Sequence, residues 1–282
     1  MEMPEEYVKA NAMPRRDVLD IIEEFSSELS QIQDKCIDIG SGPGDITKDL
    51  LLPLLPHDVE VCTSYFTGAD ISQAMVNYAR KNNSNERLSY IVLDIEGKMP
   101  NEQIGQYDYA MSFYCLHWPY DLSRAFENIF KLLRPNEKAL VMFLGSHCLF
   151  EANVRLSQNP RYEFYLQDAH RYVSYFQRKM CKNMRASLRK MLEDIGFEIL
   201  HCSKREKSSQ YNNQQSLKNQ ILPVNPFLTR MPDDIKGEFM DNLISEILSQ
   251  DTVSTPFESK NNELILKYYL LIAHVKKPQS AT

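Results

Sequence analysis

A chain of 282 residues is long enough for one large α/β domain with insertions, and its 43% hydrophobic share is ordinary for a globular protein. The net charge of −6 argues against a nucleic-acid-binding surface. No uncharged run is long enough to span a bilayer, and the acidic start Met1-Glu-Met-Pro-Glu-Glu6 does not resemble a signal peptide, so we expect no membrane insertion.

The cysteines give no sign of disulfides or of a metal site. They occur at positions 36, 62, 115, 148, 181 and 202, with no C-x-x-C pair and no histidines clustered around them. Several fall within predicted strands, where a thiol packs as a small apolar group. We therefore expect a reduced, cytoplasmic protein without a structural metal.

An amphipathic helix is predicted ahead of the first strand. From Asp17 onward, Val18, Ile21, Phe25 and Leu29 recur at helical spacing. Such a helix either closes a pocket or lies plainly on the surface, and the pattern alone does not separate the two.

The first strand leads into a glycine-rich turn. Residues 36–39 predict a buried strand, glycines follow at 40, 42 and 44, and an apolar helix is expected over 45–55. Glycine permits positive φ and lets a ligand approach the main-chain amides. The row D-x-G-x-G-x-G from Asp38 lacks the G-x-G-x-x-G spacing of dinucleotide-binding proteins, which disfavours a nicotinamide oxidoreductase. It resembles motif I of the Rossmann-like methyltransferases, which bind S-adenosylmethionine; a glycine loop without a ligand is the alternative.

Acidic residues end the next two predicted strands. The strand from 59–66 continues to Asp70, whose carboxylate can accept both hydroxyls of a ribose, and Ser72 caps a helix over 73–81. Glu60 is the alternative candidate to Asp70 for accepting the ribose hydroxyls. After a strand over 88–93, Asp94 is placed to accept the adenine amino group with Ile95 on the ring face; a solvated loop acid is the alternative.

The fourth predicted strand, 107–113, runs into the aromatic turn Tyr114-Cys-Leu-His-Trp-Pro-Tyr120. In an open parallel sheet, ligands lie outside the carboxyl ends of the strands near the point where strand order reverses. With the first and fourth strands adjacent, this turn stands beside the glycine turn. Its residues are therefore candidates for contact with a methyl acceptor.

The remaining elements complete a sheet and a cap. A helix over 121–133 and a strand over 139–144 are followed by the aromatic stretch 146–180, which suits either a lid or a helical subdomain with its own core. We then expect a helix over 184–195, a strand over 197–202, an exposed connector over 203–219, cap segments at 222–228 and 232–248, and a last strand over 264–275. The prediction is one domain over 1–282, with a core of about 30–145, 180–203 and 262–277 and a cap of about 1–30, 146–179 and 204–261.

Several stretches together resemble one family. Asp38-Ile-Gly-Ser-Gly, Asp70-Ile-Ser-Gln-Ala-Met-Val, Leu93-Asp-Ile-Glu-Gly97, Ser112-Phe-Tyr-Cys-Leu-His-Trp118 and Val224-Asn-Pro-Phe227 are similar to the juvenile hormone acid O-methyltransferases of arthropods. The resemblance covers nearly the whole chain. It implies a class I methyltransferase fold: a Rossmann-like α/β sandwich with a seven-stranded, mostly parallel sheet, an antiparallel last strand and a helical cap.

The resemblance also implies site residues and a reaction. S-adenosylmethionine would be bound by Asp38, Gly40, Ser41, Gly42, Gly44, Asp70, Ile71, Asp94, Ile95 and Ser112. The acceptor, a small lipophilic farnesoid acid, would be bound by Tyr114, Trp118, Tyr165 and Tyr172, with the Trp118 indole N–H on its carboxylate. His117 and Trp118 would be the catalytic residues, His117 as a hydrogen-bonded histidine beside the pocket. A carboxylate is ionised at pH 7, so no general base is required.

One position departs from the family. Pro14 stands where a glutamine is the usual second donor to the carboxylate, so Arg15 or Arg16 is considered as a substitute. Two alternatives stay open: methylation of a polar acid such as aconitate, held by Arg155, Arg161 and Arg171, and a binding module without turnover.

Overall fold

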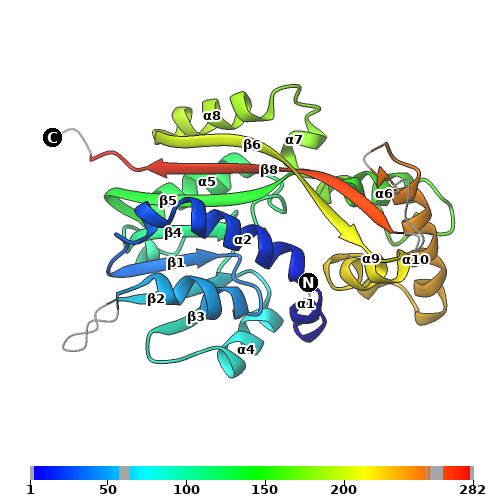
Figure 1. Ribbon diagram of the computed structural model, residues 1–282, viewed down its shortest axis with the longest axis horizontal. Coiled ribbons are helices and arrows are strands. Elements are labelled where there is room, and N and C mark those ends of the chain that lie inside the picture. Colours follow the sequence, from blue (N-terminus) through cyan, green and yellow to red (C-terminus); the bar gives the residue numbers. More distant parts are fainter. Residues whose placement is uncertain (1–2, 57–63, 252, 255–262, 280–282) are drawn as a thin grey trace.

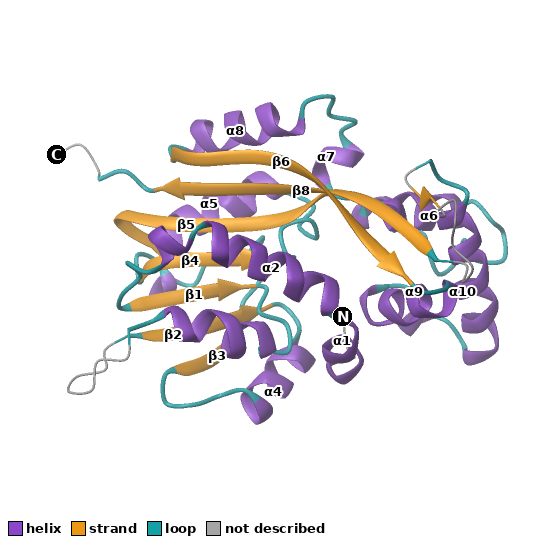
Figure 2. Ribbon diagram, in the orientation of Figure 1, coloured by secondary structure: helices purple, strands orange, loops and turns teal. Residues whose placement is uncertain are grey.

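The computed structural model describes residues 3–56, 64–251, 253–254 and 263–279, and one mixed sheet runs through it (Figures 1 and 2). Its strands are β1 (Lys35–Ile39), β2 (Tyr65–Asp70), β3 (Leu88–Val92), β4 (Tyr107–Phe113), β5 (Leu133–Ser146), β6 (Glu198–Tyr211), β7 (Val253–Ser254) and β8 (Leu264–Lys276). The order across the sheet is β3-β2-β1-β4-β5-β8-β6, and the two-residue β7 pairs with β8 outside that path.

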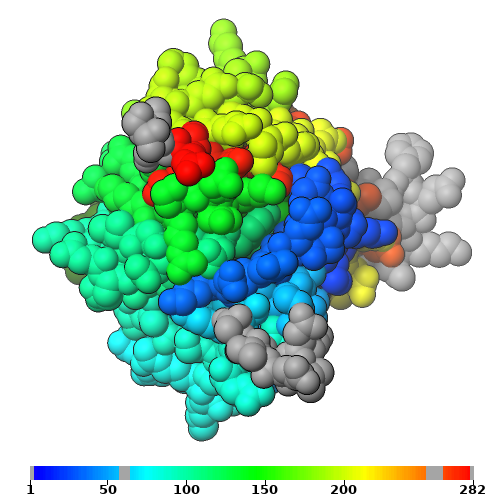
Figure 3. All heavy atoms as spheres, turned by 90° about the vertical axis from the view of Figure 1, so that its left-hand side faces the viewer, coloured from blue at the N-terminus to red at the C-terminus, as the bar shows by residue number. Residues whose placement is uncertain are grey.

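The strand directions confirm the predicted fold class. Strands β1 to β5 pair in parallel, whereas β8 lies antiparallel between β5 and β6. Figure 3 shows the end of the molecule where β8 emerges, in red, between the green of β5 and the yellow-green of β6. Strand order reverses between β1 and β4, so a ligand is expected at the carboxyl ends of these two strands.

Helices cover both faces of the sheet. They are α1 (Pro4–Ala10), α2 (Ala12–Glu24), α3 (Ser26–Leu29), α4 (Gln73–Asn82), α5 (Leu122–Leu132), α6 (Cys148–Leu156), α7 (Tyr175–Arg178), α8 (Met184–Ile195), α9 (Gln214–Ile221) and α10 (Asp233–Leu248). One face packs against α2 and α4, and the other against α5 and α8. Burial on both faces explains why β1, β4 and the second half of β5 are buried along almost their whole length and are mostly apolar. No helix in the described ranges is both long and apolar enough to cross a membrane.

Local capping signals are confirmed at two helices. The Ser72 hydroxyl accepts the Met75 backbone N–H at 3.3 Å at the start of α4. Gly196 ends α8 in the left-handed region, with φ of +107°.

The cap has its own hydrophobic core. Side chains of α6, α9 and α10 pack against the far ends of β6 and β8, to the right in Figure 1. Tyr162 is fully buried there against Phe239, with ring centroids 5.3 Å apart. The aromatic stretch 146–180 therefore contributes to a helical subdomain with a core, one of the two interpretations left open by the sequence.

The predicted exposed connector over 203–219 is wrong. β6 continues to Tyr211, paired with β8 from Glu198↔Lys276 to Tyr211↔Leu264, and α9 follows. The charged side chains of this edge strand find partners on α2, including Arg205 with Glu24 and Lys207 with Asp20. Charges that suggested a solvated loop instead attach the strand to a helix far away in the sequence.

Other boundaries differ less. The N-terminal stretch forms three short helices, which are interrupted at Asn11 and Phe25. The helix predicted over 45–55 instead has π-helical geometry at Thr47–Leu51, followed by a 3-10 turn at Leu52–Leu54. β5 begins at Leu133, earlier than predicted, with a register shift in its pairing to β4. Glu60 lies outside the described residues.

Candidate active site

The glycine turn after β1 requires glycine for two reasons. Gly40, Gly42 and Gly44 have φ of +80°, +54° and +82°, a region that side chains with a Cβ rarely adopt. A Cβ at Gly40 would lie 2.2 Å from the Cβ of Cys115, and one at Gly44 would lie 2.4 Å from the Tyr90 hydroxyl oxygen. Gly42 has open space at this position and lines a cavity, so there a ligand can approach the backbone directly.

Asp70 orients the turn from the end of β2. Its Oδ2 accepts the Gly42 N–H at 2.9 Å and its Oδ1 accepts the Ser72 N–H at 2.8 Å. Burial raises the pKa of this carboxyl, and the two backbone donors partly offset that rise. Each oxygen keeps a further lone pair for a ligand hydroxyl, as the sequence predicted for a ribose.

Three of the predicted cofactor residues, Asp38, Ser41 and Ser112, lie on the side of the turn that faces away from the adjacent cavity. Asp38 is buried and accepts the Thr47 hydroxyl at 2.6 Å, and burial raises its pKa to about 7. Ser112 donates its hydroxyl to the Ile39 carbonyl at 2.8 Å, while the Ser41 hydroxyl oxygen is buried without a hydrogen-bond partner in the part of the chain described. Together with Gly44, these residues shape the turn and do not line the cavity next to it.

That glycine-turn cavity has a volume of about 1270 Å³ and lies at the carboxyl ends of β1, β2, β3 and β4. Of the predicted cofactor residues, it is lined by Gly40, Gly42, Asp70, Ile71, Asp94 and Ile95. Ile71 is 67% exposed, an uncommon state for a large apolar side chain beside a cavity. The lining residues that the sequence analysis missed include Tyr7 and Met75, whereas Cys115 and Arg171, which also line this cavity, were considered only for the acceptor.

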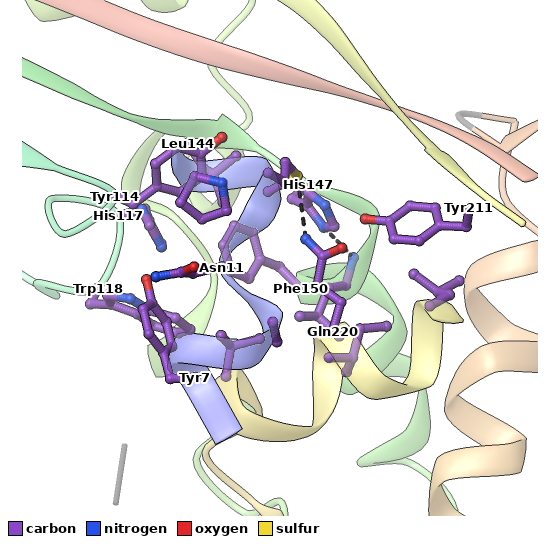
Figure 4. A pocket seen from close by; sticks show the side chains of 17 residues that line it. Tyr7, Asn11, Tyr114, His117, Trp118, Leu144, His147, Phe150, Tyr211 and Gln220 are labelled. Atoms are coloured by element: carbon purple, nitrogen blue, oxygen red, sulfur yellow. Dashed lines mark hydrogen bonds between the residues drawn. The ribbon is translucent and has the colours of Figure 1, made fainter. Parts of the chain in front are cut away.

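A second cavity, of about 740 Å³, adjoins the first (Figure 4). Its lining comes mainly from α1, α2, the turn after β4, α6 and α9, and the described residues that form it include no Asp, Glu, Lys or Arg. We call it the aromatic cavity. The two cavities share Tyr7, Tyr114, Trp118 and Val224 as lining residues. A ligand in one therefore lies next to a ligand in the other across these side chains.

The hydroxyl of Tyr114 is held by a buried cluster of polar side chains around Asp17. Its backbone has φ of +57°, and its hydroxyl donates to Asp17 Oδ2 at 2.5 Å. The same oxygen accepts the Tyr268 hydroxyl at 2.6 Å, and Arg16 and Lys207 lie 3.0 and 3.4 Å from Asp17 Oδ1. Burial and the Asp17 carboxylate raise the pKa of Tyr114. We call these five residues the Asp17 cluster; a single acid within the apolar pattern of the first helix was its only sequence signal.

His117 and Trp118 lie where the cavities meet. Their rings are 4.8 Å apart, and Trp118 also contacts Phe150 and Tyr172, with ring centroids at 6.1 and 6.3 Å. Burial, with a smaller contribution from His147, lowers the pKa of His117 to about 3. Its Nδ1 is buried and has no hydrogen-bond partner in the described ranges, so the expectation of a hydrogen-bonded histidine is wrong at this atom.

Replacing His117 with leucine should flatten the pH dependence of stability on the acid side. In the folded protein the pKa of His117 is about 3, below the ordinary value of 6.5, so between these pH values only the unfolded chain takes up the proton. The free energy of unfolding therefore falls as pH decreases, by at most about 1.4 kcal/mol per pH unit. Urea titrations from pH 7 to 4 should show a shallower fall in the variant, and the exposed His170→Gln should match the wild type. Equal slopes in all three proteins would contradict the low pKa.

The two predicted substrate-binding tyrosines of the cap have different surroundings. Tyr172 lines the glycine-turn cavity, and its hydroxyl accepts a hydrogen bond from Arg230 at 3.1 Å. Tyr165 lines neither cavity; its ring packs against Phe164 at 5.4 Å, beside the cap core. Tyr165 was therefore placed wrongly, because aromatic spacing does not distinguish a cap-core side chain from a cavity side chain.

The arginines considered as donors are engaged elsewhere. Pro14 lines the aromatic cavity, whereas Arg15 pairs with Asp45 at 2.8 Å and Arg16 pairs with Asp17. Arg155 and Arg161 pair with Glu151 and Glu238, and Arg171 lines only the glycine-turn cavity, 3.8 Å from Glu96. None of the five guanidinium groups lines the aromatic cavity, so they cannot form the converging set that a tricarboxylate needs. Among the residues described, no group of His, Cys, Asp and Glu is arranged to hold a metal ion.

The sequence of this chain matches a protein family and known individual proteins. Residues 37–141 match the family described as "Methyltransferase domain". Juvenile hormone acid O-methyltransferase of Drosophila melanogaster is 32% identical over 280 residues, covering 96% of this chain and 91% of that protein. The Bombyx mori protein of the same name is 31% identical over 243 residues, covering 86% and 84%.

Solved structures share the fold at much lower identity. A protein of Bacillus halodurans C-125 with a proposed methyltransferase assignment superposes with a TM-score of 0.55 at 12% identity, covering 90% of this chain and 98% of that one. The cyclase SpnF superposes with a TM-score of 0.52 at 14% identity, covering 93% and 82%. Because a cyclase shares this architecture, the fold alone does not decide the reaction.

Proposed function

Because this chain belongs to the juvenile hormone acid O-methyltransferase family and is an S-adenosylmethionine-dependent methyltransferase, we propose that it converts the carboxylate of a farnesoid acid to its methyl ester. The observation that carries the proposal is the junction of the two cavities at Tyr7, Tyr114 and Trp118. One cavity has the glycine turn and acids that a nucleoside requires. The other is lined by apolar and uncharged side chains among the described residues, as a lipophilic ligand requires.

The glycine-turn cavity fits S-adenosylmethionine. Gly42 leaves open space where a Cβ would project, and Asp70 has lone pairs left for the ribose hydroxyls. Ile71 and Ile95 provide apolar contact for the adenine ring, with Asp94 as an acceptor for its amino group. When bound, S-adenosylmethionine supplies an activated methyl group to the acceptor.

The chain's contribution to the reaction is to position the acceptor and exclude water. The acceptor carboxylate, with an ordinary pKa of about 4 to 5, is already ionised at pH 7 and needs no base. His117 stays neutral because its pKa is lowered to about 3, so it places no charge beside the carboxylate. The Trp118 indole N–H can donate to one carboxylate oxygen, and holding that oxygen in line with the methyl group lowers the entropic part of the barrier.

Asn11 is the side chain that we assign to the second carboxylate oxygen. It is 3% exposed, lines the aromatic cavity, and uses one amide N–H on Asp45 Oδ2 at 2.8 Å. In Figure 4 its amide is turned toward Tyr7 and Trp118. The other N–H can therefore take the role that the family's glutamine has and Pro14 cannot fill.

A product assay with several acids tests the proposal. The purified protein is offered methyl-labelled S-adenosylmethionine with farnesoic acid, its terminal epoxide, a fatty acid of similar length or aconitate, and labelled esters are identified by mass spectrometry. We expect ester from the farnesoid acids and none from aconitate, because no described residue lining the aromatic cavity is cationic. Aconitate ester alone would reverse the assignment of substrate. Binding of cofactor and farnesoid acid without any ester would establish a binding module instead.

A further inference from the structure

The aromatic turn that carries Trp118 is held at its end by a side chain from a different loop. Glu96, which follows β3, accepts the Tyr120 N–H with Oε2 at 3.0 Å and the Asp121 N–H with Oε1 at 2.9 Å. These two amides immediately precede α5, and the N-terminus of a helix favours a negative charge. Glu96 also lines the glycine-turn cavity, yet the reaction proposed above gives it no role.

The loop that carries Glu96 is itself anchored on both sides. Asp94 Oδ1 accepts the Glu96 N–H at 2.9 Å. The buried Asn128 of α5 donates its amide N–H groups to the carbonyls of Ile95 and Gly97, each at 2.8 Å. The carboxylate therefore projects from a firmly held backbone. Its two bonds to the turn are charge-assisted, which makes them stronger than bonds between neutral groups.

Two arginines of the cap contact the same turn. Arg178 donates from Nη2 to the Tyr120 carbonyl at 2.6 Å, and its guanidinium lies 3.7 Å from the centroid of the Tyr120 ring. Arg171 lies 3.5 Å from the Trp118 carbonyl and 3.8 Å from Glu96 Oε2. The Arg171 side chain is 47% exposed and that of Glu96 is 24% exposed. Because exposed ion pairs contribute little, we assign most of the restraint on the turn near Trp118 to the two hydrogen bonds of Glu96.

From these contacts we propose that Glu96 is a positioning residue for the methyl transfer, which fixes the turn so that the Trp118 indole N–H meets the acceptor carboxylate. The ring contacts with Phe150 and Tyr172 limit where the indole lies, and the backbone of the turn sets the direction from which it enters. A misplacement of about 1 Å can cost about 100-fold in rate, so a held backbone matters for turnover. The inference rests on the proposed function, because it requires an acceptor at Trp118.

The Glu96→Gln variant tests this role. Glutamine keeps the size of the side chain but offers one acceptor oxygen in place of two. Trp118 is the single tryptophan of the chain, so its fluorescence reports on the turn directly. In the ligand-free variant we expect time-resolved anisotropy to show a larger amplitude of nanosecond motion at Trp118 than in the wild type. We also expect kcat/KM for farnesoic acid to fall about tenfold, whereas the Kd of S-adenosylhomocysteine, measured by calorimetry, stays within about threefold.

Glu127→Gln is the matched control, the same substitution within α5. Glu127 pairs with Arg124 at 3.1 Å and lines neither cavity, so this variant should equal the wild type in all three measurements. If Glu96→Gln melts well below the wild type, Glu96→Asp is held to the same expectation, because its carboxylate is one methylene too short to reach both amides.

Different outcomes overturn different proposals. Unchanged motion of Trp118 or unchanged kcat/KM in Glu96→Gln overturns the positioning role while leaving ester formation intact. A loss of S-adenosylhomocysteine affinity as large as the loss of kcat/KM also overturns it, and would make Glu96 a cofactor-binding residue instead. Failure of the wild type to methylate any acid overturns the proposed function itself.

Discussion

Replacing Trp118 with phenylalanine should reduce kcat/KM for the acid about 10- to 100-fold while changing the affinity for S-adenosylhomocysteine less than twofold. Phenylalanine keeps an aromatic ring against His117, Phe150 and Tyr172 but removes the indole N–H. A hydrogen bond to a charged group contributes about 1.5–3 kcal/mol, and the loss of this amount in the transition state gives the stated range. Steady-state kinetics and calorimetry with S-adenosylhomocysteine measure the two quantities separately.

The matched control is Tyr165→Phe. Tyr165 was expected from the sequence to bind substrate, but it lines neither cavity, so its hydroxyl should not affect turnover. Turnover of Trp118→Phe within twofold of the wild type would remove Trp118 from the acceptor site. A large loss in Tyr165→Phe would show that the cap rearranges when substrate binds.

The sequence predicts well wherever the requirement is local. A positive φ at Gly40 and Gly42 and an N-cap at Ser72 depend on a few adjacent residues, and the structure has each of them. The parallel strands were equally visible, because burial on both faces favours short, mostly apolar segments. These features place the glycine turn and the aromatic turn on neighbouring strands, β1 and β4.

The sequence predicts poorly where a side chain's partner is distant along the chain. Lys207 belongs to a polar run that suggested a loop, yet it pairs with Asp20 and Asp17 from a helix almost 200 positions earlier. Arg15 was considered for the acceptor site on charge alone, although Asp45 and Asp49 bind its guanidinium outside the cavity. The charge of a residue shows which kind of group it can pair with, whereas the tertiary fold determines which of those groups lies within contact distance.

Motif identity and ligand contact are also separate matters. Asp38 belongs to the glycine motif, but alternation along β1 turns its carboxylate to Thr47, behind the turn. Tyr7 and Asn11 line the aromatic cavity although they belong to no catalytic motif, because α1 and α2 meet at its wall. A motif therefore locates the site, and the packing of remote helices completes it.

Substitution of Asp17 by alanine should lower the free energy of unfolding by about 3–5 kcal/mol, which is the cost typical of removing one partner from a buried ionic cluster. Asp17 is 1% exposed and accepts hydrogen bonds from the hydroxyls of Tyr114 and Tyr268. Without the carboxylate these hydroxyls are left buried without an acceptor, and the Arg16 and Lys207 charges lose their neutralising partner. Urea denaturation at pH 7 gives the change directly.

Asp20→Ala is the control for the loss of a charge on the same helix. Asp20 pairs with Lys207 at 2.5 Å but is half exposed, so its loss should cost less than about 1 kcal/mol. Equal effects of the two substitutions would mean that the Asp17 cluster contributes no more than a surface ion pair.

A triple variant separates the buried hydrogen bonds from simple loss of packing. Asp17→Leu combined with Tyr114→Phe and Tyr268→Phe removes the acceptor together with both hydroxyls, and Arg16 and Lys207 are exposed enough to turn toward water. Because no buried hydroxyl is then unsatisfied, the triple variant should be clearly more stable than Asp17→Ala. Its Tyr114→Phe ring still forms the wall between the cavities, so cofactor affinity should recover with stability. A triple variant no more stable than Asp17→Ala would contradict the cost assigned here to the buried hydroxyls left without an acceptor.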